Sequence, residues 1–470
     1  MKKIYILFIT LISTFAVQAQ VSFGHIQNQI SRGQKGINQF DVKKDTVAYK
    51  GLSVDMGAAF ALQFQALNSF NDQKNLPTAP AYRLNNLENN FNLPNANFTI
   101  GAQLYDGVRV NLDLYLASRH HNETWVKGGY LQIDKLDFIK KDFLKDFMQY
   151  TTIKIGQMEN NYGDAHFRRS DNGNAFMNPF VGNNIMDAFI TEMGAEIYYN
   201  RSGFVSMIGV TNSKLNQNIK EITASSPTAA KPDNNTTISP SILAKLGWDK
   251  QINEDLRIRL TGSYYHTANS SGNLYASDRA GSRFYGVMSH SGYDILDAAG
   301  NPILSPVAGQ KTTVADNFDP TANKDTGRFN PGYGNWATSY MINPFIKYKG
   351  FEFFGTLEFT SGGDYTGTDD TRKVNQYVGD LVYRFGENER FYIGGKYNLV
   401  DGKLANANTQ NIQINRFEAA AGWFMTKNVL AKLEYVDQNY KNFAQFNGTT
   451  PNDLFGGSFK GLMFEAVISF

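Results

Sequence analysis

The C-terminal stretch 459–470 alternates between apolar residues and others. From Leu462 onward every second residue is apolar, and the chain ends on that apolar face at Phe470, while Glu465 and Ser469 occupy the other face. A period of two is typical of a β-strand with one apolar face. As the last edge of a soluble sandwich, such a strand would be open to aggregation, whereas a closed membrane barrel pairs its last strand with its first. The C-terminus therefore favours a membrane barrel.

A terminal strand that ends in phenylalanine resembles the C-terminal signal of bacterial outer-membrane barrels. Phe470 carries this resemblance. It implies that Phe470 is the barrel assembly signal and that the barrel-assembly machinery is a partner of the chain.

The N-terminus reads as a secretory signal. Lys2 and Lys3 precede a mostly apolar run over 4–17, and Val17-Gln18-Ala19 is a small-residue cleavage site. The apolar run is too short for a transmembrane anchor. We therefore predict a signal peptide over 1–19, cleaved after Ala19, and an exported chain.

Composition excludes several classes of protein. Without Lys2 and Lys3, the 45 basic residues fall to 43, which equals the 43 acidic ones, so a nucleic-acid partner is not expected. The chain has no cysteine, which excludes disulfides and thiolate metal sites. Aromatic residues reach 14% while mean hydropathy is negative. A barrel can combine these properties, because only alternate strand residues face lipid.

Alternating segments recur along the whole chain. The first and longest covers Leu52 to Ala66, far longer than an ordinary soluble strand. In total we predict about sixteen strands, near 52–66, 98–104, 108–116, 123–134, 150–158, 186–200, 203–212, 241–249, 254–266, 337–349, 351–361, 374–386, 390–401, 413–426, 428–439 and 459–470. An even count is expected of a bacterial single-chain barrel.

The connections alternate between short and long. Asp106-Gly107 and Lys349-Gly350 are tight turns, whereas 159–185 and 267–336 are long loops. We predict an all-β fold: a transmembrane antiparallel β-barrel over 51–470 with short periplasmic turns and long extracellular loops. A polar periplasmic N-terminal extension over 20–50 precedes it. Between two strands, apolar residues spaced by three and four predict a short amphipathic helix over 135–149, on the periplasmic rim or as a docking surface for a partner.

The third outer loop, 159–185, carries charges of both signs. In sixteen-stranded general porins, which this layout resembles, the third outer loop folds inward and forms the constriction. The resemblance implies that Asp164, Arg168, Arg169 and Asp171 line the pore, where opposite charges in a narrow passage would select solutes. The alternative is an ordinary surface loop. The long fifth loop, 267–336, could fold inward, cap the barrel or bind a partner.

The run 152–158 (Thr-Ile-Lys-Ile-Gly-Gln-Met), followed by Asn161-Tyr162-Gly163 and the arginine-bearing loop, resembles the phosphate-selective porin O/P family of outer-membrane channels. Anion selectivity would need a ladder of basic side chains down the lumen. The charges that we place on the lumen face are mixed in sign: Arg109, Asp113, Lys154, Arg257, Arg259, Arg416, Glu418, Lys432 and Glu434. Phosphate selectivity therefore does not follow from them.

Other chemistry finds little support. The six histidines show no metal-ligand spacing; His120-His121, near Asp113 and Glu123, is the one candidate catalytic pair. Asp369-Asp370 and the run 171–174 could hold Ca²⁺, although such clusters are ordinary turn chemistry. We expect no catalytic site, no metal and no cofactor.

The function expected from these features is a porin of the Gram-negative outer membrane. It would let small hydrophilic or ionic solutes diffuse passively through a water-filled barrel. The alternative is a structural barrel subunit of a larger outer-membrane complex for protein assembly or export, because fold alone does not set function. Expected partners are the lipid bilayer with its lipopolysaccharide, and either further copies in a homotrimer or other outer-membrane proteins.

Overall fold

The computed structural model describes the chain over residues 22–24, 26–41, 44–73, 84–92, 95–117, 123–216, 239–270, 273–275, 282–290, 295–296, 302–304, 325–334, 336–363, 371–404, 410–447 and 450–470. The predicted signal peptide lies outside these ranges, as do the candidate pair His120-His121 and the run Asp369-Asp370.

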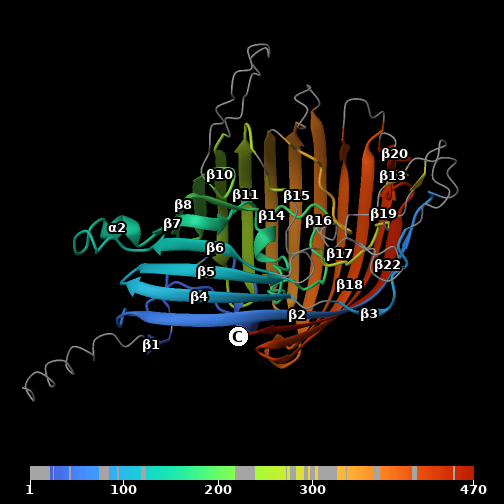
Figure 1. Ribbon diagram of the computed structural model, residues 1–470. Helices are drawn as coiled ribbons and strands as arrows, with labels where there is room; N and C mark the ends of the chain where they lie inside the picture. The colour runs from blue at the N-terminus through green and yellow to red at the C-terminus, as the bar shows by residue number, and fades with distance from the viewer. Residues whose placement is uncertain are drawn as a thin grey trace, which may run out of the picture.

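Within the described residues, sixteen long strands form a closed antiparallel β-barrel, as predicted (Figure 1). They are β2 (Ser53–Phe70), β4 (Asn95–Tyr105), β5 (Val108–Ala117), β6 (Glu123–Ile133), β7 (Thr151–Glu159), β8 (Thr191–Arg201), β9 (Phe204–Thr211), β10 (Ser241–Gln251), β11 (Leu256–Thr267), β14 (Ala337–Tyr348), β15 (Phe351–Gly362), β16 (Arg372–Phe385), β17 (Phe391–Lys403), β18 (Ile412–Thr426), β19 (Val429–Lys441) and β22 (Ser458–Ser469). Short strands of two or three residues add further pairs: β1 (Ser22–Phe23) and β3 (Asn90–Phe91) on β2, β12 (Ile295–Leu296) with β13 (Pro302–Leu304), and β20 (Phe446–Asn447) with β21 (Thr450–Pro451).

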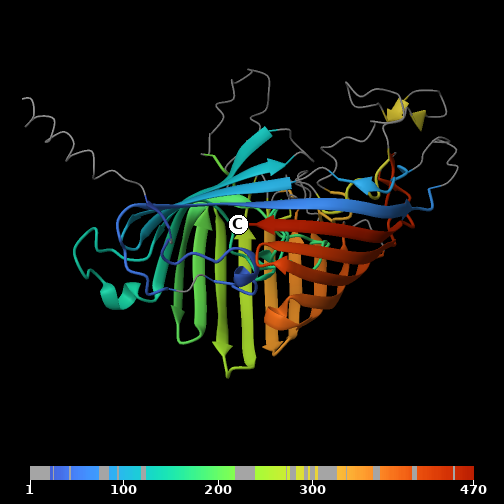
Figure 2. The same ribbon diagram turned by 90° about the horizontal axis from the view of Figure 1, so that it is seen from below.

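The last strand closes the barrel on the first. Strand β22 pairs antiparallel with β2 from Ala59 opposite Ser469 to Phe70 opposite Ser458, and Figure 2 shows the two side by side. Beyond the ladder, the Ala58 amide donates to the Phe470 carbonyl at 2.9 Å, and the Phe470 amide donates to the Ala58 carbonyl at 3.0 Å. The terminal strand therefore has no free edge, as its sequence predicts.

Alternation along each strand separates an apolar outside from a polar inside. On β2, Leu62 is 44% exposed on the outer face, while its neighbour Gln63 is 1% exposed on the inner face. Aromatic rings also meet on the outside near the short turns, as where Phe351 contacts Tyr383 with ring centroids 4.5 Å apart. This is the surface that a bilayer requires of a barrel. No helix in the described ranges is both long and apolar enough to cross a membrane.

Tight turns join the strands at one end, which we call the short-turn end. At Asp106-Gly107 the glycine has a φ of 71°, in the left-handed region that the hairpin needs.

Two elements predicted from the sequence have other bounds in the structure. The strand predicted over 186–200 begins only at Thr191. The helix predicted over 135–149 is reduced to the single turn α2 (Lys145–Met148), since Asp142 and Leu144 adopt positive φ values and stop a helix from continuing.

Candidate functional site

The connection between β7 and β8, residues 160–190, lies inside the barrel. We call it the inner loop. Its contacts reach walls far apart in the sheet: the Asn172 side chain donates to the Ala96 carbonyl of β4 at 2.7 Å, and the Met186 amide donates to Gln376 of β16 at 2.8 Å. The loop predicted third from the N-terminus therefore folds inward and crosses the lumen.

Polar side chains of the wall hold the backbone of the inner loop. The Lys432 ammonium donates to the Ala175 carbonyl at 2.6 Å. The Glu434 carboxylate accepts the Val181 amide at 2.6 Å, and the Lys396 ammonium donates to the Gly182 carbonyl at 3.0 Å. A buried loop needs such partners, because unpaired buried backbone groups are costly. The polar inner face of the barrel supplies them.

Asp164 lies in a cluster of cations from β10 and β11. Arg259 donates through Nε to its Oδ2 at 2.7 Å, and the Lys245 Nζ lies 3.2 Å from its Oδ1. Thr261 adds a hydrogen bond at 2.6 Å. Burial alone would raise the pKa of Asp164, but Lys245 and Arg259 hold it well below the usual range.

Arg168 points toward a different part of the wall. Its Nη1 lies 3.5 Å from Glu352 of β15 and donates to the Asn38 side chain, and the guanidinium stacks over Phe354 at 5.0 Å. Arg384 also donates to Glu352, at 2.6 Å. Arg168 and Asp164 are thus held by separate parts of the wall.

Arg169 and Asp171 meet each other. The Arg169 Nη1 donates to Asp171 at 3.1 Å, and the same guanidinium forms a two-point pair with Asp187. Asp171 also accepts Lys127 of β6 at 2.6 Å and the Tyr115 hydroxyl of β5. All four predicted constriction residues therefore lie inside the barrel, and each forms at least one ion pair.

The nine predicted lumen charges lie on the inner face of their strands. Several pair with other charges of the wall or bind segments inside the barrel: Arg257 pairs with Asp249 at 2.6 Å, and Arg416 donates to carbonyls of Asn183 and Gly327. The predicted set of lumen charges omits Lys245, Lys396 and Glu465, which take part in the same network. Each occupies an alternate position on a predicted strand, on the face opposite the apolar one, and this position could have predicted that it faces the lumen.

Residues 26–41 form a second segment across the lumen, at the short-turn end. We call it the N-terminal strap. The Gln34 amide donates to the Lys427 carbonyl at 3.1 Å, and the Arg109 side chain donates to the Asn28 carbonyl at 3.1 Å. Phe40 packs against Phe345, with centroids 5.1 Å apart. The strap thus spans from β5 to the turn before β19. Its sequence has no alternation, so pattern reading could not place it against the wall.

Part of the fifth outer loop also folds inward. Within 282–290, Arg283 donates to the Asn172 carbonyl of the inner loop at 2.8 Å and pairs with Glu465 of β22. Phe284 and Val287 are buried. Of the three roles considered for this loop, its residues 282–290 take the inward one.

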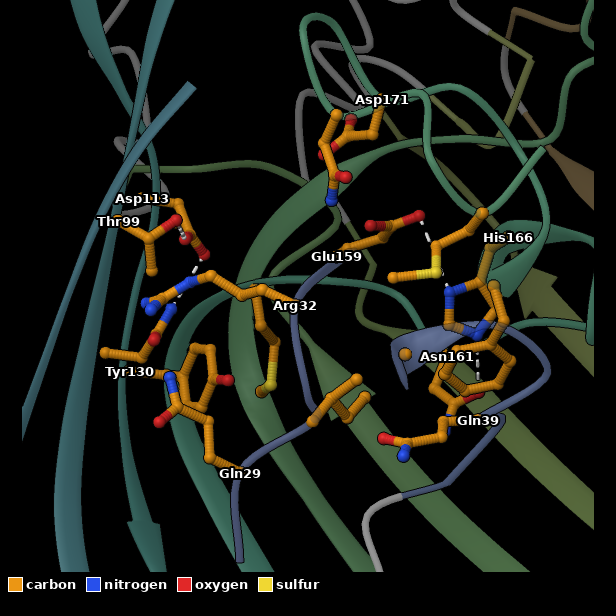
Figure 3. Close-up of a pocket in the computed structure, with 18 of the residues that line it drawn as sticks. Gln29, Arg32, Gln39, Thr99, Asp113, Tyr130, Glu159, Asn161, His166 and Asp171 are labelled. Atoms are coloured by element: carbon orange, nitrogen blue, oxygen red, sulfur yellow. Dashed lines mark hydrogen bonds and ion pairs between the residues drawn. The ribbon is translucent and has the colours of Figure 1, made fainter. Parts of the chain in front are cut away.

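A cavity of about 350 Å³ remains between the inner loop, the strap and the wall from β2 to β8. In Figure 3, Thr99, Asp113 and Tyr130 of the wall lie across from His166 and Asn161 of the inner loop. The volume is within the range of small-molecule sites. The lining carries amides, carboxylates and cations, so the cavity suits a small hydrophilic solute.

Two cations on the wall differ in their surroundings. Both lie over aromatic rings, Lys127 over Tyr115 (5.1 Å) and Phe189 (5.0 Å) and Lys154 over Tyr130 (5.3 Å) and Tyr198 (4.9 Å). Lys127 also pairs with the Asp171 carboxylate at 2.6 Å. His166 faces the cavity with Nδ1 at 3.5 Å from Glu159. Burial lowers the pKa of His166, which keeps its ring neutral near pH 7. These groups could orient a solute electrostatically.

Several solved structures are similar to this chain. OmpT, an outer-membrane protein of Vibrio cholerae, matches with 9% identity and a TM-score of 0.47, covering 91% of this chain and 100% of its own. OprB of Pseudomonas putida matches with 12% identity and a TM-score of 0.47, covering 90% of this chain and 94% of its own. An anion-selective porin from Comamonas acidovorans matches with 12% identity and a TM-score of 0.47, covering 89% of this chain and 100% of its own. No family model and no curated protein matches the chain.

The strand pairing of the chain itself defines its class. A closed ladder of sixteen strands, apolar outside and polar inside, is a β-barrel of the membrane-spanning type.

Proposed function

We propose that this chain is an outer-membrane porin, exported by a cleaved signal peptide, through which small hydrophilic or ionic solutes diffuse passively. It catalyses no reaction. The observation that carries the proposal is the cavity beside the inner loop, with charged and amide side chains in its lining, inside a barrel with an apolar outer surface. A barrel of about sixteen strands is too wide for its wall side chains to fill, so a loop that narrows it can act as a size filter.

Solutes would be filtered where the inner loop meets the wall. Asp171 and Arg169 border the cavity together with Lys127. Because the charges there have both signs, we propose selection by size and local field, without a preference for phosphate. Asp164 and Arg168 would hold the loop in place, since their partners belong to β10, β11 and β15.

Conductance of the purified barrel in a planar bilayer tests this function. Stepwise channels are expected, and reversal potential under a salt gradient would report ion preference. Lys154→Gln should shift that preference toward cations, because Lys154 borders the cavity. Lys349→Gln, a matched change on an exposed turn, should leave it unchanged. A barrel that inserts correctly but stays silent would overturn the proposal.

One observation favours the second candidate, a structural barrel subunit of a larger complex. The inner loop and the N-terminal strap together occupy much of the lumen, and their contacts are dense and paired. A silent barrel that purifies only together with other outer-membrane polypeptides would support this role. A barrel that purifies alone or as a homotrimer and conducts would support the porin.

A further inference from the structure

The connection between β6 and β7 carries an unusual set of exposed side chains. We call its residues 136–148 the rim segment. It exposes five large apolar side chains, with Ile139 the most exposed at 61%: Phe138, Ile139, Phe143, Leu144 and Phe147. In Figure 1 the segment around α2 projects from the short-turn end of the barrel. In water alone this apolar surface would be unfavourable.

The rim segment contacts the outer face of the barrel wall. Phe147 stacks on Tyr199 of β8, with ring centroids 6.2 Å apart and planes at 26°. Tyr199 shares its face with Ile197, which is exposed to the outside. The apolar surface of the rim segment is therefore continuous with the apolar surface that surrounds the barrel.

The rim segment carries three lysines and three aspartates, so its charges balance. Lys135, just before it, pairs with Asp106 at 2.7 Å, and Lys145 pairs with Asp142 at 3.1 Å. Lys140 and Lys141 lie between the apolar residues and form no ion pair among the described residues. Lysines in such positions extend toward phosphate groups while their stems cover apolar surface.

We propose that the rim segment lies in the interface of the periplasmic leaflet. Its apolar side chains enter the boundary of the acyl chains, and Lys140 and Lys141 meet the lipid phosphates. Phospholipid is the occupant that fits, because the patch continues a surface that already faces lipid. This inference rests on the proposed membrane-inserted barrel, and it adds a lipid-binding element outside the sixteen strands.

Spin labelling can test the proposal, because the chain has no cysteine. A nitroxide is attached at Ile139→Cys in the full-length barrel reconstituted in phosphatidylethanolamine and phosphatidylglycerol vesicles. Its collision rates with oxygen and with a water-soluble nickel complex are measured. Two sites serve as references: Leu260→Cys on the outward face of β11, and Glu254→Cys in the exposed turn before it.

The ratio of oxygen to nickel accessibility at Ile139 should shift from the value at Glu254 toward that at Leu260. If Ile139 behaves like Glu254 while Leu260 reports lipid, the rim segment is in water and the inference is wrong. Shielding from both reagents at Ile139 would indicate a protein contact and would also overturn it. If Leu260 itself reports water, the barrel is not inserted, and the proposed function fails instead.

Discussion

The Arg169 guanidinium binds the Asp187 carboxylate at two points, 2.9 Å from Nε to Oδ1 and 2.7 Å from Nη2 to Oδ2. Both residues belong to the inner loop. Arg169 also donates to Asp171, which in turn pairs with Lys127 of the wall. The pair therefore joins the two arms of the loop and attaches them to β5 and β6.

Replacing this arginine should loosen the inner loop. Arg169→Ala removes the two-point partner of Asp187 and leaves Arg328 and Lys127 as the remaining cations near Asp187 and Asp171. The expected loss is therefore at or below the lower end of the roughly 3–5 kcal/mol of a fully broken buried pair. The variant should unfold at lower temperature and show larger, noisier channel currents. Arg201→Ala, at the exposed end of β8, is the control. Unchanged stability and conductance in Arg169→Ala would contradict this role.

Acid should release the inner loop, and only at low pH. Burial would raise the pKa of Asp187, but Arg169 and Arg328 hold it below its ordinary value of 3.8. A lowered pKa contributes stability above that ordinary value, and the contribution is lost as the pH falls through the pKa of the folded state. The pKa of Asp164 is also lowered, so its contribution to stability is lost in the same direction of pH. Channel currents should thus stay constant between pH 7 and about pH 4 and change below it. A change in channel currents already between pH 7 and about pH 5 would show that protonation of Asp187 and Asp164 does not release the inner loop.

A side chain at Gly173 should push the inner loop off the wall. A Cβ there would lie 2.6 Å from the Ala59 carbonyl oxygen and 2.7 Å from that of Asn95. Gly173→Val should destabilise the barrel by about 1–3 kcal/mol through overpacking. Gly262→Val is the control, since a Cβ at Gly262 meets no atom within 4 Å. Thermal unfolding followed by gel mobility measures both. Equal unfolding temperatures would show that the loop yields at no cost.

Deleting Phe470 separates two roles of the last residue. Its backbone extends the β2–β22 pairing by two hydrogen bonds, while its side chain is the proposed assembly signal. Phe470→Ala keeps the backbone and should fold in detergent like the unchanged chain, but should reach the outer membrane in reduced amount. Deletion of the residue should impair both. Normal amounts of Phe470→Ala in the membrane would exclude the signal.

The strands were predictable, because lipid outside and polar contacts inside impose alternation on every strand. The partners of the inner loop were not. Lys245 lies 81 residues from Asp164, and no local pattern links them. The position of the strap inside the barrel could not be predicted for a related reason. Asn28 and Gln34 form hydrogen bonds to the wall, and their sequence shows no periodicity. In the rim segment, apolar spacing predicted a helix that the positive φ of Leu144 interrupts.

The contacts of the inner loop impose an order of assembly. Asn172 donates to the Ala96 carbonyl of β4, Val181 donates to Glu434 of β19, and Arg283 connects Asn172 to β22. These strands come together only when the chain closes on itself, so the complete binding surface for the loop does not exist on a partly formed sheet. The part of the loop around Asn172 and Val181 would therefore reach its final place only when the last strand pairs with the first, as a late event of maturation.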